Sequence, residues 1–216
     1  MLLVRFSVIV CCSTLFFSSK AICLLSSSIA AAIFGPPGAG KGTQADFIVK
    51  KYNLYQLSTG EVLRNEIKNE TNLGKEISSI INSGFLVSDQ IVKKLVENFI
   101  SNKKFKNRLI FDGYPRNLNQ AETLHELLKE YGQKIDLVLK LSVSLEIIKK
   151  RISERRSLEK REDDNEDIAV KRFKTYEKTT EPVIEYYKKL NLLKVIDGER
   201  PIDQINKEIS EIIDLI

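Results

Sequence analysis

The chain of 216 residues is 43% hydrophobic and 29% charged, with 10 Gly, 5 Pro, 3 Cys, a single His and no Trp. This length suits one sizeable domain, and the apolar fraction with the modest Gly and Pro counts excludes the collagen-like, low-complexity and disordered classes. The chain has 34 Lys and Arg, of which only Arg5 and Lys20 lie in residues 1–34, so the remainder holds 32 basic and 29 acidic residues. This charge balance is too even to indicate a nucleic-acid partner.

Residues 1–28 form an apolar, Ser-rich extension without acidic residues. Arg5 and Lys20 break it into runs shorter than the roughly 20 apolar residues of a membrane span. The pattern is similar to a secretory signal or an organelle transit peptide, and upstream sequence from a misplaced start is a third interpretation. We expect the mature domain in the cytoplasm without stable membrane association, or in an organelle or secreted if the extension is a genuine targeting peptide.

Cysteine and histidine are almost absent from the rest of the chain. Cys11, Cys12 and Cys23 all lie in the extension, which excludes a disulfide framework or a Cys-ligated zinc site beyond it. The single His125 lies in a charged, helical pattern typical of a solvated surface. We therefore expect chemistry that needs neither a thiol nor an imidazole.

From residue 29 onward, short apolar runs alternate with helical periodicities, which is typical of an α/β domain with a mostly parallel sheet. Candidate strands are Ile29–Phe34, Tyr55–Leu57, Leu109–Phe111, Leu137–Leu141 and Leu192–Ile196. The first has alanine at positions 30 to 32, a poor strand former, but it directly precedes a glycine-rich turn.

Three helical patterns are clear. The first comprises Ala45, Ile48, Val49 and Tyr52. The second comprises Val92, Leu95, Val96 and Phe99, and it follows Ser88 and Asp89, which can cap a helix. The third is an apolar stripe on the last helix, formed by Ile202, Ile205, Ile209, Ile212 and Ile216. The segment 153–167 is dense in charge and nearly free of apolar residues. It is either a solvated loop or helix face, or a mobile element over an anionic ligand.

The strongest motif is GPPGAGKGT, residues 35–43, between the first strand and the first helix. Its glycines let backbone amides wrap phosphate oxygens, the helix start adds its dipole, and Lys41 can reach terminal phosphates. Gly42 stands where Ser or Thr normally follows the lysine, and the hydroxyl comes one residue later at Thr43. This departure points away from a generic ATPase and towards a particular subgroup.

Two further motifs follow strand ends. In QLSTGEVLR, a small polar turn leads into a helix whose first turns carry Arg64, suited to a second phosphate. In LIFDGYPR, Asp112 follows a strand at the edge where ligands of open α/β sheets bind, and it is well placed to hold Mg²⁺ through water. Arg116 adds a positively charged, planar guanidinium group nearby.

The last cluster is a series of charges from residue 151 to residue 172: Arg151, Arg155, Arg156, Arg161, Asp163, Asp164 and Arg172. Taken singly, each is more typical of a solvated surface. Together with the glycine-rich loop, they indicate phosphoryl transfer, because that reaction depends on positioning, Mg²⁺ and cations rather than on a catalytic His or Cys.

The ordered motifs GPPGAGKGT, QLSTGEVLR, FDGYPRNLNQAE and REDDNED followed by KRFKTYEKTTEPVIEYY resemble those of adenylate kinases over about residues 29–216. The resemblance implies a P-loop NTPase core with a five-stranded parallel sheet, an AMP-binding segment at 58–87 and a short lid at about 152–164. It implies reversible phosphoryl transfer from Mg·ATP to AMP, giving two ADP. Zinc is not expected, since the insertion that binds it in some bacterial relatives is missing.

The resemblance also implies residue roles. Catalytic residues would be Lys41, Arg116, Arg155, Arg161 and Arg172. ATP would bind Gly38, Ala39, Gly40, Lys41, Gly42, Thr43, Arg151 (on the adenine), Arg155 and Arg200 (through its backbone). AMP would bind Thr59, Arg64, Phe85, Leu86, Val87, Gly113, Tyr114, Pro115, Arg116, Gln120 (facing the base), Arg161 and Arg172. Asp163 and Asp164 would orient the arginines, and Arg156 could exchange roles with Arg155.

Two alternatives stay open. A UMP or CMP kinase would share the fold, but Thr59 and Gln120 favour AMP, because pyrimidine-specific relatives tend to have Ala and Asn there. A non-catalytic nucleotide-binding protein would keep the P-loop without needing the full arginine set. We expect ATP, AMP and ADP as small-molecule partners, and a monomer.

Overall fold

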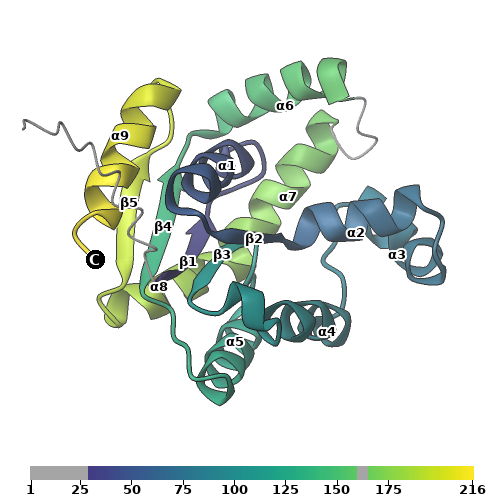
Figure 1. Cartoon of the computed structure of the whole chain (residues 1–216). Coiled ribbons are helices and arrows are strands. Elements are labelled where there is room, and N and C mark those ends of the chain that lie inside the picture. The colour runs from purple at the N-terminus through teal and green to yellow at the C-terminus, as the bar shows by residue number, and fades with distance from the viewer. Residues whose placement is uncertain (1–28, 160–164) are drawn as a thin grey trace, which may run out of the picture.

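A five-stranded, all-parallel sheet with helices on both faces forms the centre of the computed structural model, which describes residues 29–159 and 165–216 (Figure 1). The strands are β1 (Ile29–Phe34), β2 (Tyr55–Ser58), β3 (Arg108–Asp112), β4 (Leu137–Ser142) and β5 (Leu193–Asp197), in the spatial order β2-β3-β1-β4-β5. Each predicted strand is confirmed to within one residue at either end, and so is the predicted fold class.

Helices occupy most of the connections between strands. They are α1 (Lys41–Tyr52), α2 (Thr59–Lys68), α3 (Asn72–Asn82), α4 (Asp89–Ile100), the 3₁₀ turn η1 (Lys103–Phe105), α5 (Leu118–Glu130), α6 (Leu145–Glu159), α7 (Glu166–Thr179), α8 (Glu181–Lys189) and α9 (Ile202–Ile213). Within the described ranges, no helix is long and apolar enough to cross a membrane.

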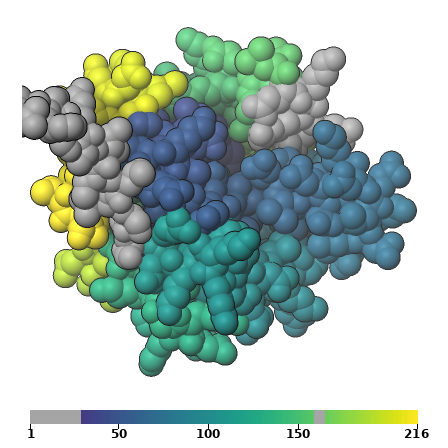
Figure 2. All heavy atoms as spheres, in the orientation of Figure 1, coloured from purple at the N-terminus to yellow at the C-terminus, as the bar shows by residue number. Residues whose placement is uncertain are grey.

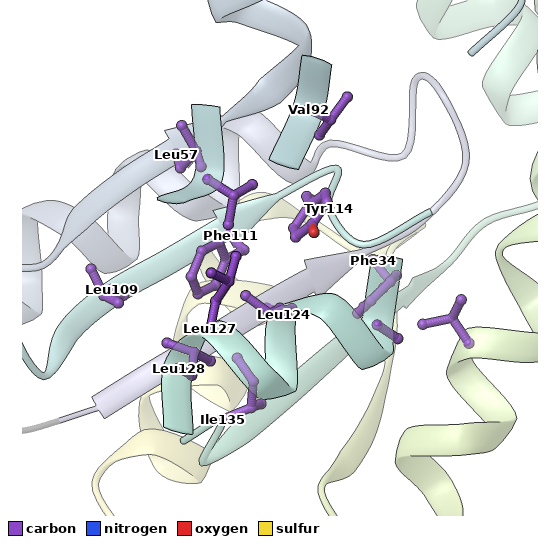
Figure 3. Close-up of a cluster of buried hydrophobic side chains, with 14 of the residues drawn as sticks. Phe34, Leu57, Val92, Leu109, Phe111, Tyr114, Leu124, Leu127, Leu128 and Ile135 are labelled. Carbon is purple, nitrogen blue, oxygen red and sulfur yellow. The ribbon is translucent and has the colours of Figure 1, made fainter. Parts of the chain in front are cut away.

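The central strand β1 is buried along its whole length, and its side chains alternate between two hydrophobic cores. Ala30, Ala32 and Phe34 face the core with α4, α5 and α8, whereas Ile29 and Ile33 face the core with α1 and α9. Burial between two helical layers therefore outweighs the weak strand propensity of alanine. Figure 3 shows the first core.

The parallel register brings the chemistry-bearing motifs to one edge of the sheet. Asp112, the last residue of β3, pairs with Ile33 of β1 on one side and with Ser58 of β2 on the other. The glycine-rich loop after β1, the turn after β2 and Asp112 consequently meet at the carboxyl ends of the strands, where open α/β sheets bind ligands.

Two pairs of helices stand beside this edge. Helices α2 and α3 extend from the end of β2 as a lobe at the right of Figures 1 and 2, and α6 and α7 pack together above the sheet. The charged segment 153–167 is helical up to Glu159 and again from Glu166. Arg161, Asp163, Asp164 and the rest of 160–164 lie outside the described residues, as does the extension 1–28 with its cysteines.

Two helix predictions need correction. In α9, Ile205, Ile209 and Ile213 are buried, but Ile202 and Ile216 are 56% and 63% exposed, because the helix ends at Ile213 and turns its first residue towards solvent. The predicted cap also differs: Ser88 precedes α4 but its side chain makes no capping hydrogen bond. The prediction that His125 is exposed is confirmed.

Candidate active site

A polar cleft of about 810 Å³ lies at the carboxyl edge of the sheet, between the glycine-rich loop, α2 and the helices α6 and α7. Most of the sequence-predicted site residues line it: Gly38, Gly40, Lys41, Gly42, Thr43, Arg64, Phe85, Leu86, Asp112, Gly113, Pro115, Arg116, Arg151, Arg155 and Arg172. Segments more than 100 residues apart in the sequence thus share one cavity.

The glycine-rich loop wraps around the side chain of its own lysine. The Lys41 Nζ donates to the carbonyl oxygens of Gly35 (2.7 Å) and Pro36 (3.0 Å), and Lys41 is also the first residue of α1. Gly38 has φ +81°, and a Cβ there would lie 3.1 Å from Ile152, so glycine lets the loop pass close beneath α6. Loop amides next to the start of a helix are suited to binding an anion such as phosphate.

Asp112 is the acidic group at the centre of the site. It is only 8% exposed, and its Oδ2 accepts a hydrogen bond from Gln56 Nε2 at 3.3 Å. Its negative charge favours the protonated forms of both Lys41 and Arg116. The carboxylate therefore balances part of a strongly positive surface.

The Arg116 side chain is held by a backbone carbonyl on the loop that follows β3. Its Nε donates to the Gly113 oxygen at 2.7 Å, and Thr59 Oγ1 donates to the same oxygen at 3.1 Å. A Cβ added at Gly60 would lie 3.2 Å from Arg64 Nη1 and 3.6 Å from Arg116 Nη2. Two guanidinium groups thus converge beside the first turn of α2.

Burial and, after it, crowded positive charge lower the pKa values of Lys41 and Arg116 in the cleft. Burial, with smaller contributions from Arg116, Arg155 and Arg172, lowers the pKa of Lys41 to about 8 against the opposing effect of Asp112. Burial, followed by the charge of Arg172, lowers the pKa of Arg116 to about 10. Such a cluster is unfavourable when no anion is present, so it is suited to binding highly charged phosphates.

Helix α6 presents two arginines to the cleft. Arg151 Nη2 donates to the Gly198 oxygen at 2.9 Å and its Nη1 donates to the Ala39 oxygen at 3.4 Å, which joins the glycine-rich loop to the turn after β5. Arg155 lines the cleft, whereas its neighbour Arg156 is exposed and lies outside the lining. Of the two interchangeable candidates, the geometry favours Arg155.

A second pocket of about 40 Å³ shares walls with the large cleft. It is lined by the other described residues predicted for AMP, which are Thr59, Val87, Tyr114 and Gln120. Gln120 is 3% exposed, and its amide contacts the Arg116 backbone and Asp89. The pocket has room for only a few water molecules, so a nucleotide base would not fit into it as it stands.

Two predicted residues lie away from the cleft lining. Ala39 is 2% exposed and meets the site only through its carbonyl oxygen. The Arg200 side chain is paired with Glu208 and Asp197 instead of facing the cleft. Arg161, Asp163 and Asp164 are not among the described residues.

Sequence reasoning missed several polar residues of the site. Thr180, the residue before α8, donates from Oγ1 to the Arg116 carbonyl at 3.0 Å, and Gln56 holds Asp112. Thr180 directly precedes Glu181 and Pro182 at the start of a helix, so the sequence predicts a helix cap at this position. Asp89 was assigned to a helix start, but its carboxylate reaches the neighbouring helix α5.

The residues present fit a magnesium ion that arrives with a nucleotide. Within the described ranges, no three His, Cys, Asp or Glu residues gather as a protein-only metal site. Asp112 supplies one hard oxygen ligand at the edge of the cleft, and Mg²⁺ in phosphate sites commonly combines one or two carboxylates with waters and phosphate oxygens.

Known proteins resemble this chain over most of its length. The sequence model of the family described as adenylate kinase matches residues 33–192. A protein named adenylate kinase from Pelagibacter ubique (strain HTCC1062) is 44% identical over 207 residues, covering 84% of this chain and 97% of the relative. Adenylate kinases from Prochlorococcus marinus (strain MIT 9515) and Caldicellulosiruptor bescii are 45% and 39% identical, each over 82% of this chain and 94% and 95% of the relative.

Proposed function

Because the chain belongs to the adenylate kinase family and transfers a phosphoryl group reversibly from ATP to AMP, we propose that its cleft binds ATP at the glycine-rich loop and AMP beside α2. Lys41, Arg116 and Arg172 then lie between the two nucleotides. The observation that carries this division is the convergence of cations from the P-loop, the loop after β3 and α7 on one cavity.

On the ATP side, the loop amides and Lys41 hold the β- and γ-phosphates, and Arg151 offers a flat guanidinium to the adenine. The Arg200 backbone contributes to the same base site. Magnesium, when bound, would supply positive charge to the ATP phosphates, with Asp112 holding it through water.

On the AMP side, Arg64 and Arg116 hold the phosphate, and Thr59, Gln120 and the backbone of residues 85–87 surround the base. An AMP phosphate oxygen attacks the γ-phosphorus of ATP, and the bond from that phosphorus to the bridging β-phosphate oxygen breaks. The arginines offset the charge on the transferring group, so the protein acts by positioning and electrostatics. Arg155, with Arg161 oriented by Asp163 and Asp164, would act at the same group.

We also propose that residues 58–87 form the AMP-binding segment, that about 152–164 form a short lid, and that the domain 29–216 acts as a cytoplasmic monomer. N-terminal sequencing of the mature protein tests the status of residues 1–28. An intact extension on a catalytically active protein would contradict its removal as a targeting peptide.

A coupled assay with Mg·ATP and each nucleoside monophosphate tests the function. We expect AMP to be strongly preferred; comparable turnover of CMP would favour the pyrimidine alternative. The Arg116→Ala variant should lose turnover by about 10³-fold or more, as for other arginines that contact a transferring phosphoryl group. Arg156→Ala, which changes an exposed arginine outside the cleft, is the matched control. Full activity of Arg116→Ala would contradict the role assigned to Arg116, and absence of turnover in the wild type with every monophosphate would support a merely nucleotide-binding role.

A further inference from the structure

The amide of Gln120 is held from two sides. Its Oε1 accepts from the Arg116 backbone N–H at 2.8 Å, and its Nε2 donates to Asp89 Oδ1 at 2.6 Å. Gln120 is 3% exposed and lines the small pocket that we assign to the AMP base. The contacts therefore act on a side chain with little freedom to move.

These two partners allow only one orientation of the amide. If the group were turned by 180°, its oxygen would face the carboxylate oxygen of Asp89, and its NH₂ would face the N–H of Arg116. Both contacts would become repulsive. The oxygen and nitrogen positions of Gln120 thus follow from the chemistry of the neighbours.

Asp89 is itself fixed. Asn117 Nδ2 donates to its Oδ1 at 3.1 Å, and Asn119 Nδ2 donates to its Oδ2 at 2.8 Å. Burial alone would raise the pKa of Asp89, but hydrogen bonds from Asn119, Gln120 and Asn117 outweigh it and hold the pKa below its ordinary value. The group is an ionised acceptor at neutral pH, surrounded by three side-chain amides that donate to it.

An amide has two N–H donors and two acceptor positions. Asp89 takes one donor of Gln120 and Arg116 takes one acceptor position, so one N–H and one lone pair stay available for the base. A 6-aminopurine such as adenine presents a matching ring-nitrogen acceptor and an exocyclic N–H donor. A 6-oxopurine such as hypoxanthine presents the reverse pair, an N–H on the ring and an oxygen at position 6, and would require the amide to turn over.

We propose that Asp89 is a specificity-determining residue that makes this site reject 6-oxopurine monophosphates, by holding the Gln120 amide in the orientation that fits a 6-aminopurine. Asp89 is a positioning residue in this scheme, since it acts through Gln120 and does not touch the substrate. The proposal rests on the assignment of Gln120 to the AMP base, and it goes further by explaining discrimination among purines.

The test compares AMP with IMP, which differ only in this donor and acceptor pair. For wild type, Asp89→Ala, Asp89→Asn and Gln120→Ala, kcat/KM is measured for both monophosphates with Mg·ATP. Both substrates are assayed on the same preparation, so the AMP/IMP ratio does not depend on how much of a variant is folded. Glu97→Gln, which neutralises an exposed carboxylate on the same helix α4, is the matched control.

We expect the AMP/IMP ratio to fall at least tenfold in Asp89→Ala, which corresponds to about 1.4 kcal/mol. A hydrogen bond to a charged group contributes at least this much. Asp89→Asn should lie between wild type and Asp89→Ala, because its own amide can still offer an oxygen to Gln120, and Glu97→Gln should keep the wild-type ratio. An unchanged ratio in Asp89→Ala, in a protein whose AMP turnover falls on Gln120→Ala, would overturn the role of Asp89 and leave the proposed function intact. Unchanged AMP turnover in Gln120→Ala would instead overturn the base assignment itself.

Discussion

Replacing Lys41 by methionine should remove phosphoryl transfer and yet stabilise the nucleotide-free protein. Burial lowers the pKa of Lys41 from 10.5 to about 8. At about 1.36 kcal/mol per pH unit, keeping this group charged in the folded protein costs about 3 kcal/mol relative to water. The hydrogen bonds to Gly35 and Pro36 that methionine cannot make offset about 1 kcal/mol of this. We therefore expect Lys41→Met to gain about 2 kcal/mol in the free energy of unfolding at pH 7.

The gain should depend on pH with a definite sign. Between pH 8 and pH 10.5 the unfolded chain keeps its proton on Lys41 while the folded protein has lost it, so the contribution of this group to wild-type stability rises with pH in that window. The advantage of Lys41→Met should be complete below pH 8 and should vanish as the pH approaches 10.5.

Thermal unfolding of both proteins from pH 7 to pH 10, without nucleotide, tests this reasoning. A gain of about 2 kcal/mol corresponds to roughly 4 to 8 °C in Tm for a domain of this size. Lys50→Met is the control, because Lys50 is an exposed lysine on the same helix α1 and should show neither the gain nor the pH dependence. A Lys41→Met protein that is less stable than wild type at pH 7, or a difference that stays constant up to pH 10, would refute the argument.

Two further predictions concern the lobe of α2 and α3 and its contact with α7. A Cβ at Gly74 would lie 2.1 Å from the carbonyl oxygen of Glu66, so Gly74→Ala should lower the free energy of unfolding by about 1 to 3 kcal/mol in a denaturant titration. Gly132→Ala would meet no atom within 4 Å but would force alanine into φ +65°, so it measures the cost of backbone strain alone. A Gly74→Ala protein as stable as wild type would argue against the close helix crossing. Lys171 Nζ lies 3.7 Å from the centre of the Phe85 ring. Lys171→Met should therefore raise the KM for AMP about 2- to 5-fold and leave the KM for ATP unchanged. Lys171→Arg should restore the wild-type KM for AMP. A KM for AMP that stays at the wild-type value in Lys171→Met would contradict this coupling.

The sheet could be predicted from the sequence because its strands are short apolar runs closed by glycine or polar turns. Even the alanine-rich β1 was identified, since the glycine-rich loop that follows it marks where a strand must end. Asp112 could be placed for the same reason: a carboxylate directly after an apolar run lies at the ligand-binding edge of a parallel sheet. Signals of this kind are local, because each lies within one short stretch of the sequence.

Features that depend on the packing of distant segments were not predictable in this way. The periodicity of α9 extended to Ile202 and Ile216, but which residues are buried depends on where the helix meets α1 and the sheet. The sequence around Asp89 is that of a helix start, and only the position of α5 turns its carboxylate towards Gln120. Likewise, the pairing of Arg200 with Glu208 requires the turn before α9 to be in place.

Affinity and selectivity in this cleft have separate physical origins. Lys41 and Arg116 are held charged at a cost in stability, and any ligand that brings phosphate anions relieves that cost, whatever base it carries. The small pocket that we assign to the AMP base is lined by Gln120, which is oriented by neutral and charged hydrogen-bond partners. Added salt should consequently weaken every nucleotide through the phosphates, whereas changes near Gln120 should alter the ranking of bases and leave phosphate binding in place. In the proposed scheme, the neutralisation of cations by phosphate would supply binding energy, and the fixed Gln120 amide would decide which monophosphate receives the phosphoryl group.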